Sequence, residues 1–596
     1  MSTFDPLAYS PVTASAISAD GRIIVACVRR HDPVADASRV DLHRYDGGWL
    51  RLNAEGETLF DPQLSRDGRL AALRERDEAD LVVLDPADGR VLAEPPGMPR
   101  GTVALKWWGE PPGLAVIGFD DENTRRVWVW RDLARPPEVA TPPRRRVGDY
   151  AIAPGSDRIV WIHAPPRSVR PVENALYLGA VGGAVHQRVA LPESPLGLLS
   201  FSPDGRRLAL ISRPHAEPLT SPRLWVIDLD AAEAVRLLED RPGWVTGYDW
   251  TPDGQALIVA LEQGVDGALW RVGVDGAAER VGPAGVYLSG PRLDRASGRM
   301  IHLHQSGHEP QHARLWEPGA PASVPISRFH EALDLPALRP QERLAWRSTD
   351  DLKIEGLLMR PAGDPPYPLI VWLHGGPAEH IQRTFSPYFQ ALASAGFAVL
   401  APNCRGSTGR DDAFLRALVG GVCQADLADV EIGVRRLITS GVAHRRRVGL
   451  MGWSYGASLA LALGASCRWV RAIVAGAPVV DWLGVFGAVT YPLLTPAWFP
   501  GEPWEAPEAY DRASPLRRLA TLEAPALLLH GELDDRVPVS QSRLAWHLLS
   551  ARGVQTDLRL FPGEGHVFGQ PWAVREMLDR AALWFREHLA DAEGDG

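Results

Sequence analysis

Apolar runs recur along the first half of the chain at a regular spacing, and each run follows a turn signal. The turn pairs are Asp-Gly or similar residues, and the first residue of each pair stands at positions 20, 67, 112, 156, 204, 253 and 297. Each repeat also carries a second apolar run with a polar end, as in LVVLD at 81–85. Repeats of about 45 residues with hairpin signals predict an N-terminal seven-bladed β-propeller. A two-sheet β-sandwich or a pair of them is the alternative, because short strands also alternate with turns there.

After about Pro336 the pattern changes to apolar strands that alternate with helical stretches. LIVWLHGG at 369–376 and FAVLAPNC at 397–404 are such strands, and each is followed by a stretch with helical periodicity. This alternation predicts an α/β domain with a doubly wound, mostly parallel sheet. We therefore divide the chain into residues 1–330, the propeller, and residues 331–596, one large α/β domain.

Composition and charge exclude some classes of binding partner. The 596 residues are 45% hydrophobic and 23% charged, with a formal net charge of -10. No basic surface for nucleic acid or for an anionic membrane is expected. Four cysteines are too few for a disulfide framework and show no zinc-binding spacing. Since the N-terminus also lacks a basic segment followed by an apolar one, we expect a cytoplasmic protein.

Residues 448–464 (VGLMGWSYGASLALALG) read as a strand, a tight turn and a helix. Gly452, Ser454 and Gly456 form a G-x-S-x-G motif at that turn. In a nucleophile elbow the glycines let the strand and the helix cross closely, and the serine is presented above the sheet at a helix N-terminus. Ser454 is therefore the predicted nucleophile of an α/β-hydrolase fold, with a passive serine in a glycine-rich turn as the alternative.

A serine hydroxyl needs a base and an acidic residue to orient that base. In α/β-hydrolases these follow in the order Ser, Asp or Glu, His, on loops after later strands. The segment 524–538 carries Asp534, with Glu532 and Asp535 in the same loop, and the segment 558–568 carries His566. The order is satisfied by Asp534 and His566, and Asp535 remains the local rival for the acid.

Two other histidines, His374 and His530, each precede a glycine at a strand end. Neither follows the predicted acid in chain order, so we interpret both as packing or turn residues. An oxyanion hole needs two backbone N–H donors. Tyr455, directly after the nucleophile, is expected to supply one, and Gly376 in the HGGP loop is expected to supply the other.

These residues belong to a longer set of motifs that resembles the prolyl oligopeptidase family of serine peptidases. The motifs are HGGP (374–377), NCRGSTG (403–409), GWSYG (452–456), GAPVVDW (476–482), SPL (514–516), HGELDDRVPVSQS (530–542) and GEGH (563–566). The resemblance covers nearly the whole chain and implies a seven-bladed propeller that caps a C-terminal α/β-hydrolase domain. The family's HGxxD pattern places the acid on Asp534 and not on Asp535.

Within that family the chain is most similar to the acylaminoacyl-peptidase and dipeptidyl-peptidase-like branches. Arg536 resembles an arginine that acylaminoacyl peptidases carry beside the substrate; a loop arginine paired with nearby carboxylates is the alternative. No glutamate matches those that hold the substrate amine in dipeptidyl-type enzymes. Trp498 and Phe499, with Trp504, are candidates for an apolar pocket on the acyl side, or else form a cap of core aromatic residues.

The expected function is hydrolysis of short peptides or acyl-peptides through an acyl-enzyme, with no metal or organic cofactor. A dipeptidyl or aminopeptidase-type exopeptidase and an esterase or amidase acting on a small metabolite are the alternatives with the same triad. An interaction protein with a silent hydrolase domain is the alternative from another class, and the survival of all the triad elements argues against it. The family resemblance also allows a homo-oligomer, although no segment identifies an interface.

Overall fold

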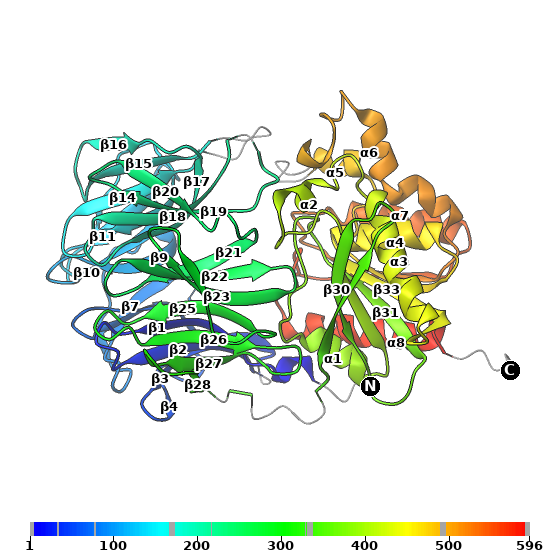
Figure 1. The fold of residues 1–596 in the computed structure, drawn as a ribbon, viewed down its shortest axis with the longest axis horizontal. Coiled ribbons are helices and arrows are strands. Elements are labelled where there is room, and N and C mark those ends of the chain that lie inside the picture. The colour runs from blue at the N-terminus through cyan, green and yellow to red at the C-terminus, as the bar shows by residue number, and fades with distance from the viewer. Residues whose placement is uncertain are drawn as a thin grey trace.

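The computed structural model describes residues 5–32, 35–76, 79–165, 173–215, 217–327, 329–330, 338–488 and 496–590. Its two halves lie side by side and differ in kind (Figure 1). The half coloured blue to green is built from strands, and the other half is a sheet with helices around it. The predicted change of pattern along the chain is confirmed.

Residues 12–325 form successive groups of four strands, each group paired in chain order. Five groups are separate antiparallel sheets. Their strands are β1 (Val12–Ile17), β2 (Ile24–Asp32), β3 (Ala37–Tyr45), β4 (Trp49–Arg51); β5 (Leu59–Leu64), β6 (Leu70–Arg74), β7 (Asp80–Leu84), β8 (Val91–Ala93); β9 (Arg100–Trp108), β10 (Gly113–Phe119), β11 (Arg125–Trp130), β12 (Glu138–Val139); β13 (Val147–Ile152), β14 (Arg158–His163), β15 (Ala175–Ala180), β16 (His186–Val189); and β17 (Ser194–Phe201), β18 (Arg207–Arg213), β19 (Arg223–Asp228), β20 (Glu233–Leu237).

Two further groups share one sheet and are joined by a single parallel pair, Gly267 with Tyr287. Their strands are β21 (Trp244–Trp250), β22 (Ala256–Gln263), β23 (Asp266–Gly273), β24 (Ala278–Val281) and β25 (Tyr287–Leu293), β26 (Met300–Gln305), β27 (His312–Trp316), β28 (Val324–Pro325). Four antiparallel strands per repeat is the arrangement of propeller blades.

The same side-chain hydrogen bonds recur in the turn between the first two strands of several groups. The hydroxyl of Ser202 donates to Asp204 Oδ1 (2.5 Å) and accepts the Arg207 N–H (2.9 Å). Thr251 and Asp253 make the same contact at 2.6 Å. The next residue, Gly205 or Gly254, has a positive φ that a side chain would strain. The turn signals read from the sequence are therefore hydrogen-bonded turns that fix the hairpin register.

The last group of strands packs against the first. The backbone N–H groups of Arg295 and Ala296 donate to Ala19 O at 3.1 and 2.9 Å. Ile24 of β2 shares an apolar cluster with Ile301 of β26 and Ala313 of β27. Residues almost 280 positions apart are thus brought together, and the last group lies next to the first.

The C-terminal half holds an eight-stranded sheet in the order β29-β30-β32-β31-β33-β34-β35-β36. β29 (Gln341–Arg347) and β30 (Lys353–Met359) are antiparallel, and from β32 onward every neighbouring pair is parallel. The remaining strands are β31 (Tyr367–Leu373), β32 (Ala398–Asn403), β33 (Ala443–Trp453), β34 (Val470–Gly476), β35 (Ala526–Gly531) and β36 (Thr556–Phe561). The predicted mostly parallel sheet is confirmed.

Helices cover both faces of this sheet. Side chains of α3, α4 and α7 form one core with Leu369 and Val371, whereas α1 and α8 form the other with Ile370. Alternate residues of β31 thus face opposite cores, which explains why its sequence is apolar throughout. The helices are α1 (Pro387–Ser394), α2 (Asp412–Arg416), α3 (Ala425–Thr439), α4 (Tyr455–Ser466), α5 (Trp482–Phe486), α6 (Pro507–Ala513), α7 (Ser540–Ala551) and α8 (Pro571–His588), with short 3-10 turns η1 (Pro6–Ala8), η4 (Pro496–Trp498) and η5 (Pro515–Thr521).

The two halves are joined by specific hydrogen bonds. Gly264 N donates to Gly409 O at 2.6 Å, and Ser221 N donates to Asp412 Oδ1 at 2.8 Å. The predicted boundary after residue 330 borders residues 331–337, which lie outside the described residues. β28 ends at Pro325 and β29 begins at Gln341.

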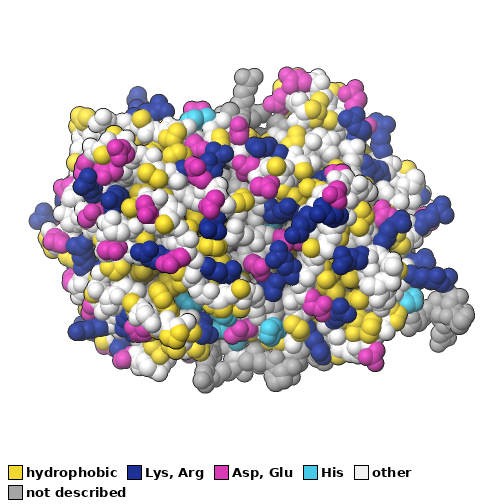
Figure 2. All heavy atoms as spheres, viewed as in Figure 1, with side chains coloured by type: hydrophobic (Ala, Val, Ile, Leu, Met, Phe, Trp, Pro, Cys, Tyr) yellow, Lys and Arg dark blue, Asp and Glu magenta, His cyan; other side chains and the backbone are white. Residues whose placement is uncertain are grey.

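The visible surface carries charges of both signs. Figure 2 shows basic and acidic side chains intermixed over the face that it draws. Among the helices of the described ranges, none combines the length and the apolar character needed to cross a bilayer.

A buried ion pair ties the loop after β32 to the rest of the α/β domain. Arg405 donates to both carboxylate oxygens of Asp429 at 2.7 and 2.9 Å, and Asp429 is fully buried on α3. Ser348 donates to Asp429 Oδ1 at 2.5 Å, and Arg405 also contacts Asp350. The loop that carries Ser407 toward the end of β31 is therefore anchored by charge as well as by packing.

Arg405→Met should lower the free energy of unfolding of this domain by about 3–5 kcal/mol, because it leaves the Asp429 carboxylate buried without a counter-charge. Urea denaturation followed by tryptophan fluorescence measures the loss. Arg435→Met is the matched control, since Arg435 makes an exposed pair with Glu431 whose removal costs under about 1 kcal/mol. Equal effects of the two substitutions would contradict the anchoring role of Arg405.

Candidate active site

Ser454 stands in the turn between β33 and α4, at the carboxyl end of the parallel strands. Its backbone has φ 56° and ψ -121°, a conformation that is uncommon for a residue with a side chain, and its N–H donates to Gly476 O at 2.8 Å. A Cβ on Gly456 would lie 2.0 Å from Leu373 O. The predicted strand–turn–helix is therefore present, and its glycine is required because α4 crosses the end of β31 at backbone contact distance.

His566 and Asp534 meet above the same edge of the sheet. His566 Nδ1 lies 2.7 Å from Asp534 Oδ2. The other carboxylate oxygen accepts the backbone N–H groups of Arg536 (2.9 Å) and Val537 (2.8 Å). Asp535, the local rival for the acid, is exposed.

Hydrogen bonds determine the ionisation of Asp534. Burial alone raises the pKa of this carboxyl, but hydrogen bonds from His530, His566 and the Val537 N–H outweigh it and hold the pKa well below its usual range. The ionised carboxylate stabilises the folded state above the unfolded pKa near ~4, and this stabilisation is lost as the pH falls further toward the folded pKa. Asp534 is therefore a carboxylate throughout the neutral range, as an acceptor for the His566 Nδ1–H requires.

The loop that carries His566 is tied to the elbow and to the loop of Asp534. The Trp453 indole, next to Ser454, donates to His566 O at 2.7 Å. Leu533 N donates to Glu564 O at 2.8 Å. The buried carboxylate of Glu564 accepts the backbone N–H groups of Gly569 and Gln570, which follow His566 in the same loop. These contacts bring the predicted serine, aspartate and histidine loops to one place.

The HGGP loop follows β31 next to the elbow. Gly376 has φ +107°, and a Cβ there would lie 2.5 Å from Ala378 N, so only glycine fits. The His374 ring hydrogen-bonds with Gly375 O (2.8 Å) and Ser407 Oγ (2.9 Å), which fixes the loop. Tyr455 is the first residue of α4, where a helix leaves backbone N–H groups without intrahelical partners. The two predicted oxyanion donors thus come from elements in direct contact.

The side chain of Tyr455 lies in a buried polar cluster that the sequence did not suggest. Its hydroxyl donates to Asp426 Oδ2 and accepts the Cys423 N–H at 3.3 Å. Burial raises the pKa of Asp426 to about 7, although the Tyr455 hydroxyl opposes the shift. The only sequence signal was an acidic residue near the start of an amphipathic helix, which is common at exposed helix ends.

His530 makes more contacts at the candidate site than the sequence indicated. It is fully buried, and its Nε2 lies 2.9 Å from Val537 O and 3.2 Å from Asp534 Oδ2. Because a carbonyl oxygen only accepts, this nitrogen carries a proton and faces the Asp534 carboxylate. His530 is thus a packing residue, as interpreted, that also helps to hold Asp534.

The residues predicted to contact substrate differ in exposure. The side chain of Arg536 is exposed and pairs with no carboxylate of the described residues. Trp498 and Phe499 are 2% and 5% exposed, and they share a core cluster with Tyr455. Phe499 stacks on Tyr510 with ring centroids 3.8 Å apart, while Trp504 is 69% exposed. Arg536 is accessible to a ligand, and a role for the two buried rings stays a prediction.

Comparisons with known proteins agree with this geometry. Residues 383–592 match the profile of the prolyl oligopeptidase family. The acylamino-acid-releasing enzyme of Rattus norvegicus is 30% identical over 293 residues, which cover 46% of this chain and 40% of that enzyme. The uncharacterized peptidase YuxL of Bacillus subtilis is 31% identical over 256 residues, which cover 42% of this chain and 39% of that protein. The sequence match thus spans about two fifths of these relatives.

A structural likeness extends over the whole chain. The acylaminoacyl peptidase of Pyrococcus horikoshii superposes with a TM-score of 0.85 at 18% identity and covers 100% of this chain and 99% of its own. At that identity the likeness shows the fold, an N-terminal propeller and a C-terminal hydrolase domain. The C-terminal part of this chain is similar in sequence to the prolyl oligopeptidase family and to acylamino-acid-releasing enzymes.

Proposed function

We propose that this protein is a serine peptidase that hydrolyses short peptides or acyl-peptides, with Ser454 as nucleophile, His566 as general base and Asp534 as the acid that orients the base. The observation that carries the proposal is the 2.7 Å contact between His566 Nδ1 and Asp534 Oδ2, on a loop held by the residue before Ser454. The family of the C-terminal part and its similarity to acylamino-acid-releasing enzymes support the substrate class.

The reaction follows from the roles of these atoms. Ser454 Oγ attacks the substrate carbonyl carbon while His566 Nε2 takes its proton, and Asp534 stabilises the resulting imidazolium through Nδ1. The negative oxygen of the tetrahedral intermediate accepts hydrogen bonds from the Gly376 and Tyr455 N–H groups. His566 then protonates the leaving amine, and water, activated by the same imidazole, releases the acyl group from Ser454.

The architecture supports a seven-bladed propeller over residues 1–330 and a hydrolase domain over residues 331–596. Each of the seven turn signals begins a hairpin in a different group of strands, and the contacts of Ala19 with residues 295–296 join the last group to the first. A closed ring leaves no sheet group without a neighbour on either side, which protects the strand faces from solvent.

Ser454→Ala should abolish labelling by a fluorophosphonate probe and reduce turnover to the level that binding and the oxyanion hole alone supply, about 10³–10⁴-fold over water. The measurements are gel fluorescence of the probe adduct and initial rates on chromogenic anilides. Ser466→Ala, at the other end of α4, is the matched control and should label normally. A labelled Ser454→Ala protein would refute the assignment of the nucleophile.

Asp534→Asn should reduce kcat by about 10⁴-fold, because an amide no longer holds the imidazole in the productive tautomer. Asp535→Asn changes the next carboxylate, which is exposed, and should leave kcat nearly unchanged. Steady-state kinetics on one anilide compares the two variants. The reverse order of effects would move the acid to Asp535.

Arg536→Ala should raise KM for an N-acetylated anilide more than for the same anilide with a free amine, because the exposed guanidinium is available to donate hydrogen bonds to the acyl carbonyl. Arg543→Ala, an exposed arginine on α7, is the control. Faster hydrolysis of the free-amine substrate by the wild-type protein would instead support an aminopeptidase or dipeptidyl-type enzyme, with the triad assignment intact.

A further inference from the structure

The hairpin formed by β26 and β27 carries two histidines and a glutamate that converge outside the catalytic domain. His304 and His312 are directly opposite each other in the antiparallel register, so both side chains lie on one face. Glu309 comes from the connecting loop, which is closed by a hydrogen bond from Ser306 N to Glu309 O at 3.0 Å. On the face drawn in Figure 2, histidines gather over the region where β26 and β27 lie in Figure 1.

The distances among these three groups are those of metal ligands. His304 Nε2 lies 3.2 Å from Glu309 Oε2, and His312 Nε2 lies 3.4 Å from Glu309 Oε1. One ligand atom from each of the three residues falls within 4.8 Å of the others. Zinc bonds to nitrogen and oxygen of about 2.0–2.2 Å in a tetrahedron place ligand atoms roughly 3.3–3.6 Å apart. The separation of 3.4 Å lies in this range, and that of 3.2 Å, which is also a hydrogen bond between His304 and Glu309, lies just below it.

The hydrogen-bond partner of His312 fixes which of its nitrogens is free to coordinate. Its Nδ1 lies 3.1 Å from Pro310 O, and a carbonyl oxygen only accepts, so Nδ1 carries the proton. In the neutral ring, Nε2 then presents a lone pair toward the Glu309 carboxylate. Two electron-rich atoms 3.4 Å apart repel each other unless a cation lies between or beside them. A backbone carbonyl that orients a histidine in this way is the usual support of a metal ligand.

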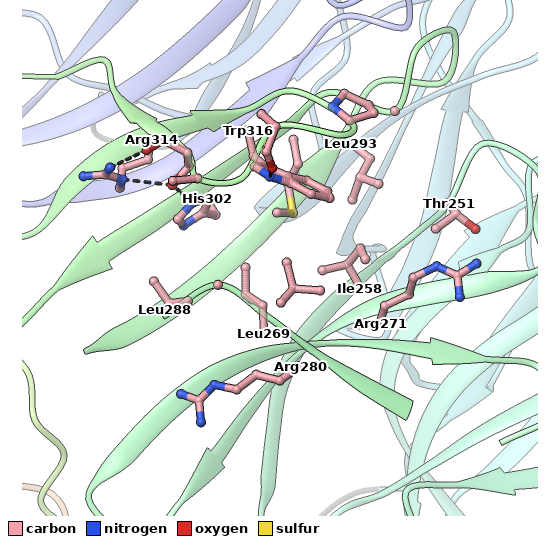
Figure 3. A pocket seen from close by; sticks show the side chains of 18 of the residues that line it. Thr251, Ile258, Leu269, Arg271, Arg280, Leu288, Leu293, His302, Arg314 and Trp316 are labelled. Atoms are coloured by element: carbon pink, nitrogen blue, oxygen red, sulfur yellow. Dashed lines mark hydrogen bonds between the residues drawn. The ribbon is translucent and has the colours of Figure 1, made fainter. Parts of the chain in front are cut away.

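We propose that His304, Glu309 and His312 bind a divalent first-row metal ion, with Zn²⁺ as the best fit, and that a water completes the tetrahedron. Two histidines and one glutamate form a known zinc donor set, and imidazole nitrogen suits zinc better than calcium or magnesium. Solvent reaches the site from a cavity of 870 Å³ that His304 lines together with His302 and Arg314. Figure 3 shows His302 and Arg314 next to each other at one end of this cavity.

Arg314 competes with this ion for His312. Its Nη1 lies 3.4 Å from His312 Nε2, so the positively charged guanidinium lies beside the lone pair of this nitrogen. Its Nε donates to Ser323 Oγ at 2.9 Å, and its Nη2 donates to Ser323 O. Binding of an ion must displace this Nη1 contact and the hydrogen bond between His304 Nε2 and Glu309 Oε2, while the Ser323 contacts hold the rest of the Arg314 side chain. Arg314 therefore weakens the site without blocking it.

The location gives the ion a structural role. Gln305 Oε1 accepts Phe385 N at 3.1 Å, and Gly307 O accepts the Gln390 side-chain amide at 2.9 Å. Both contacts join the hairpin to the start of α1 in the hydrolase domain. An ion that clamps the hairpin holds these contacts in place, so it should stabilise the folded protein by an amount that grows with the logarithm of the free ion concentration above its dissociation constant.

The test is a titration of the full-length, EDTA-treated protein with Zn²⁺ by calorimetry, together with the absorption spectrum after addition of Co²⁺. We expect one ion per chain, tetrahedral d–d bands for cobalt, and a melting temperature that rises with Zn²⁺. Glu309→Gln and His312→Gln should each weaken binding at least tenfold. His308→Gln, which changes an exposed histidine in the same loop, should bind like the wild type.

Arg314→Gln separates this proposal from a purely hydrogen-bonded cluster. It should bind Zn²⁺ several-fold more tightly than the wild type, because the competing cation is gone. Equal Zn²⁺ affinity in the wild type, Glu309→Gln and His312→Gln, or the lack of tetrahedral cobalt bands in the wild-type protein, would overturn the proposal. The wild-type cobalt spectrum decides the matter even where a variant fails to fold, and neither readout depends on the peptidase activity.

Discussion

The close crossing of α4 over the end of β31 is the constraint on which the catalytic half depends. Gly456 meets Leu373 O and His374 O at distances that exclude a Cβ, and Gly452 packs against the backbone of Gly456 in the same way. This crossing sets the loop of Ser454 and the HGGP loop side by side, and Ser454 at the turn has a positive φ. The strain is sustained because strands packed on both faces surround the turn.

Around this crossing, loops that begin on different strands are tied together by polar contacts. Arg405 and Asp429 hold the loop after β32, and Ser407 of that loop contacts His374. The Trp453 indole holds the loop of His566, and His530 contacts Asp534 from beneath. Buried polar groups of this kind stabilise a site only when each has a partner, so the same contacts that orient the reacting groups also restrict the loops to one arrangement.

The propeller contacts the second half of the chain through backbone and side-chain hydrogen bonds. The turn between β22 and β23 lies next to the loops at Gly409 and Arg383, with which Gly264 and Val265 make backbone hydrogen bonds. The β26–β27 hairpin contacts α1 from the same side, and its His304, Glu309 and His312 lie within the blade. A structural ion there would act on the junction of the two halves, at a distance from the triad in sequence and by a chemistry independent of it.

Local chemistry in the sequence determined the repeat of strands, the alternation of strands and helices, and the elbow at Ser454. Asp-Gly turns, two-residue alternation and the G-x-S-x-G motif are decided by neighbouring residues, so they can be read without a fold. The order of Asp534 and His566 could also be read, because parallel strands present their following loops at one edge.

Which contacts those residues make required the tertiary structure. His530 and Asp426 lie next to the candidate site residues only because β35 ends and α3 begins there, and Trp498 and Phe499 are buried because α6 packs over them. The pairing of Ala19 with residues 295–296 joins segments far apart in sequence. The burial that raises the pKa of Asp426 exists only after α3 and α4 have packed together.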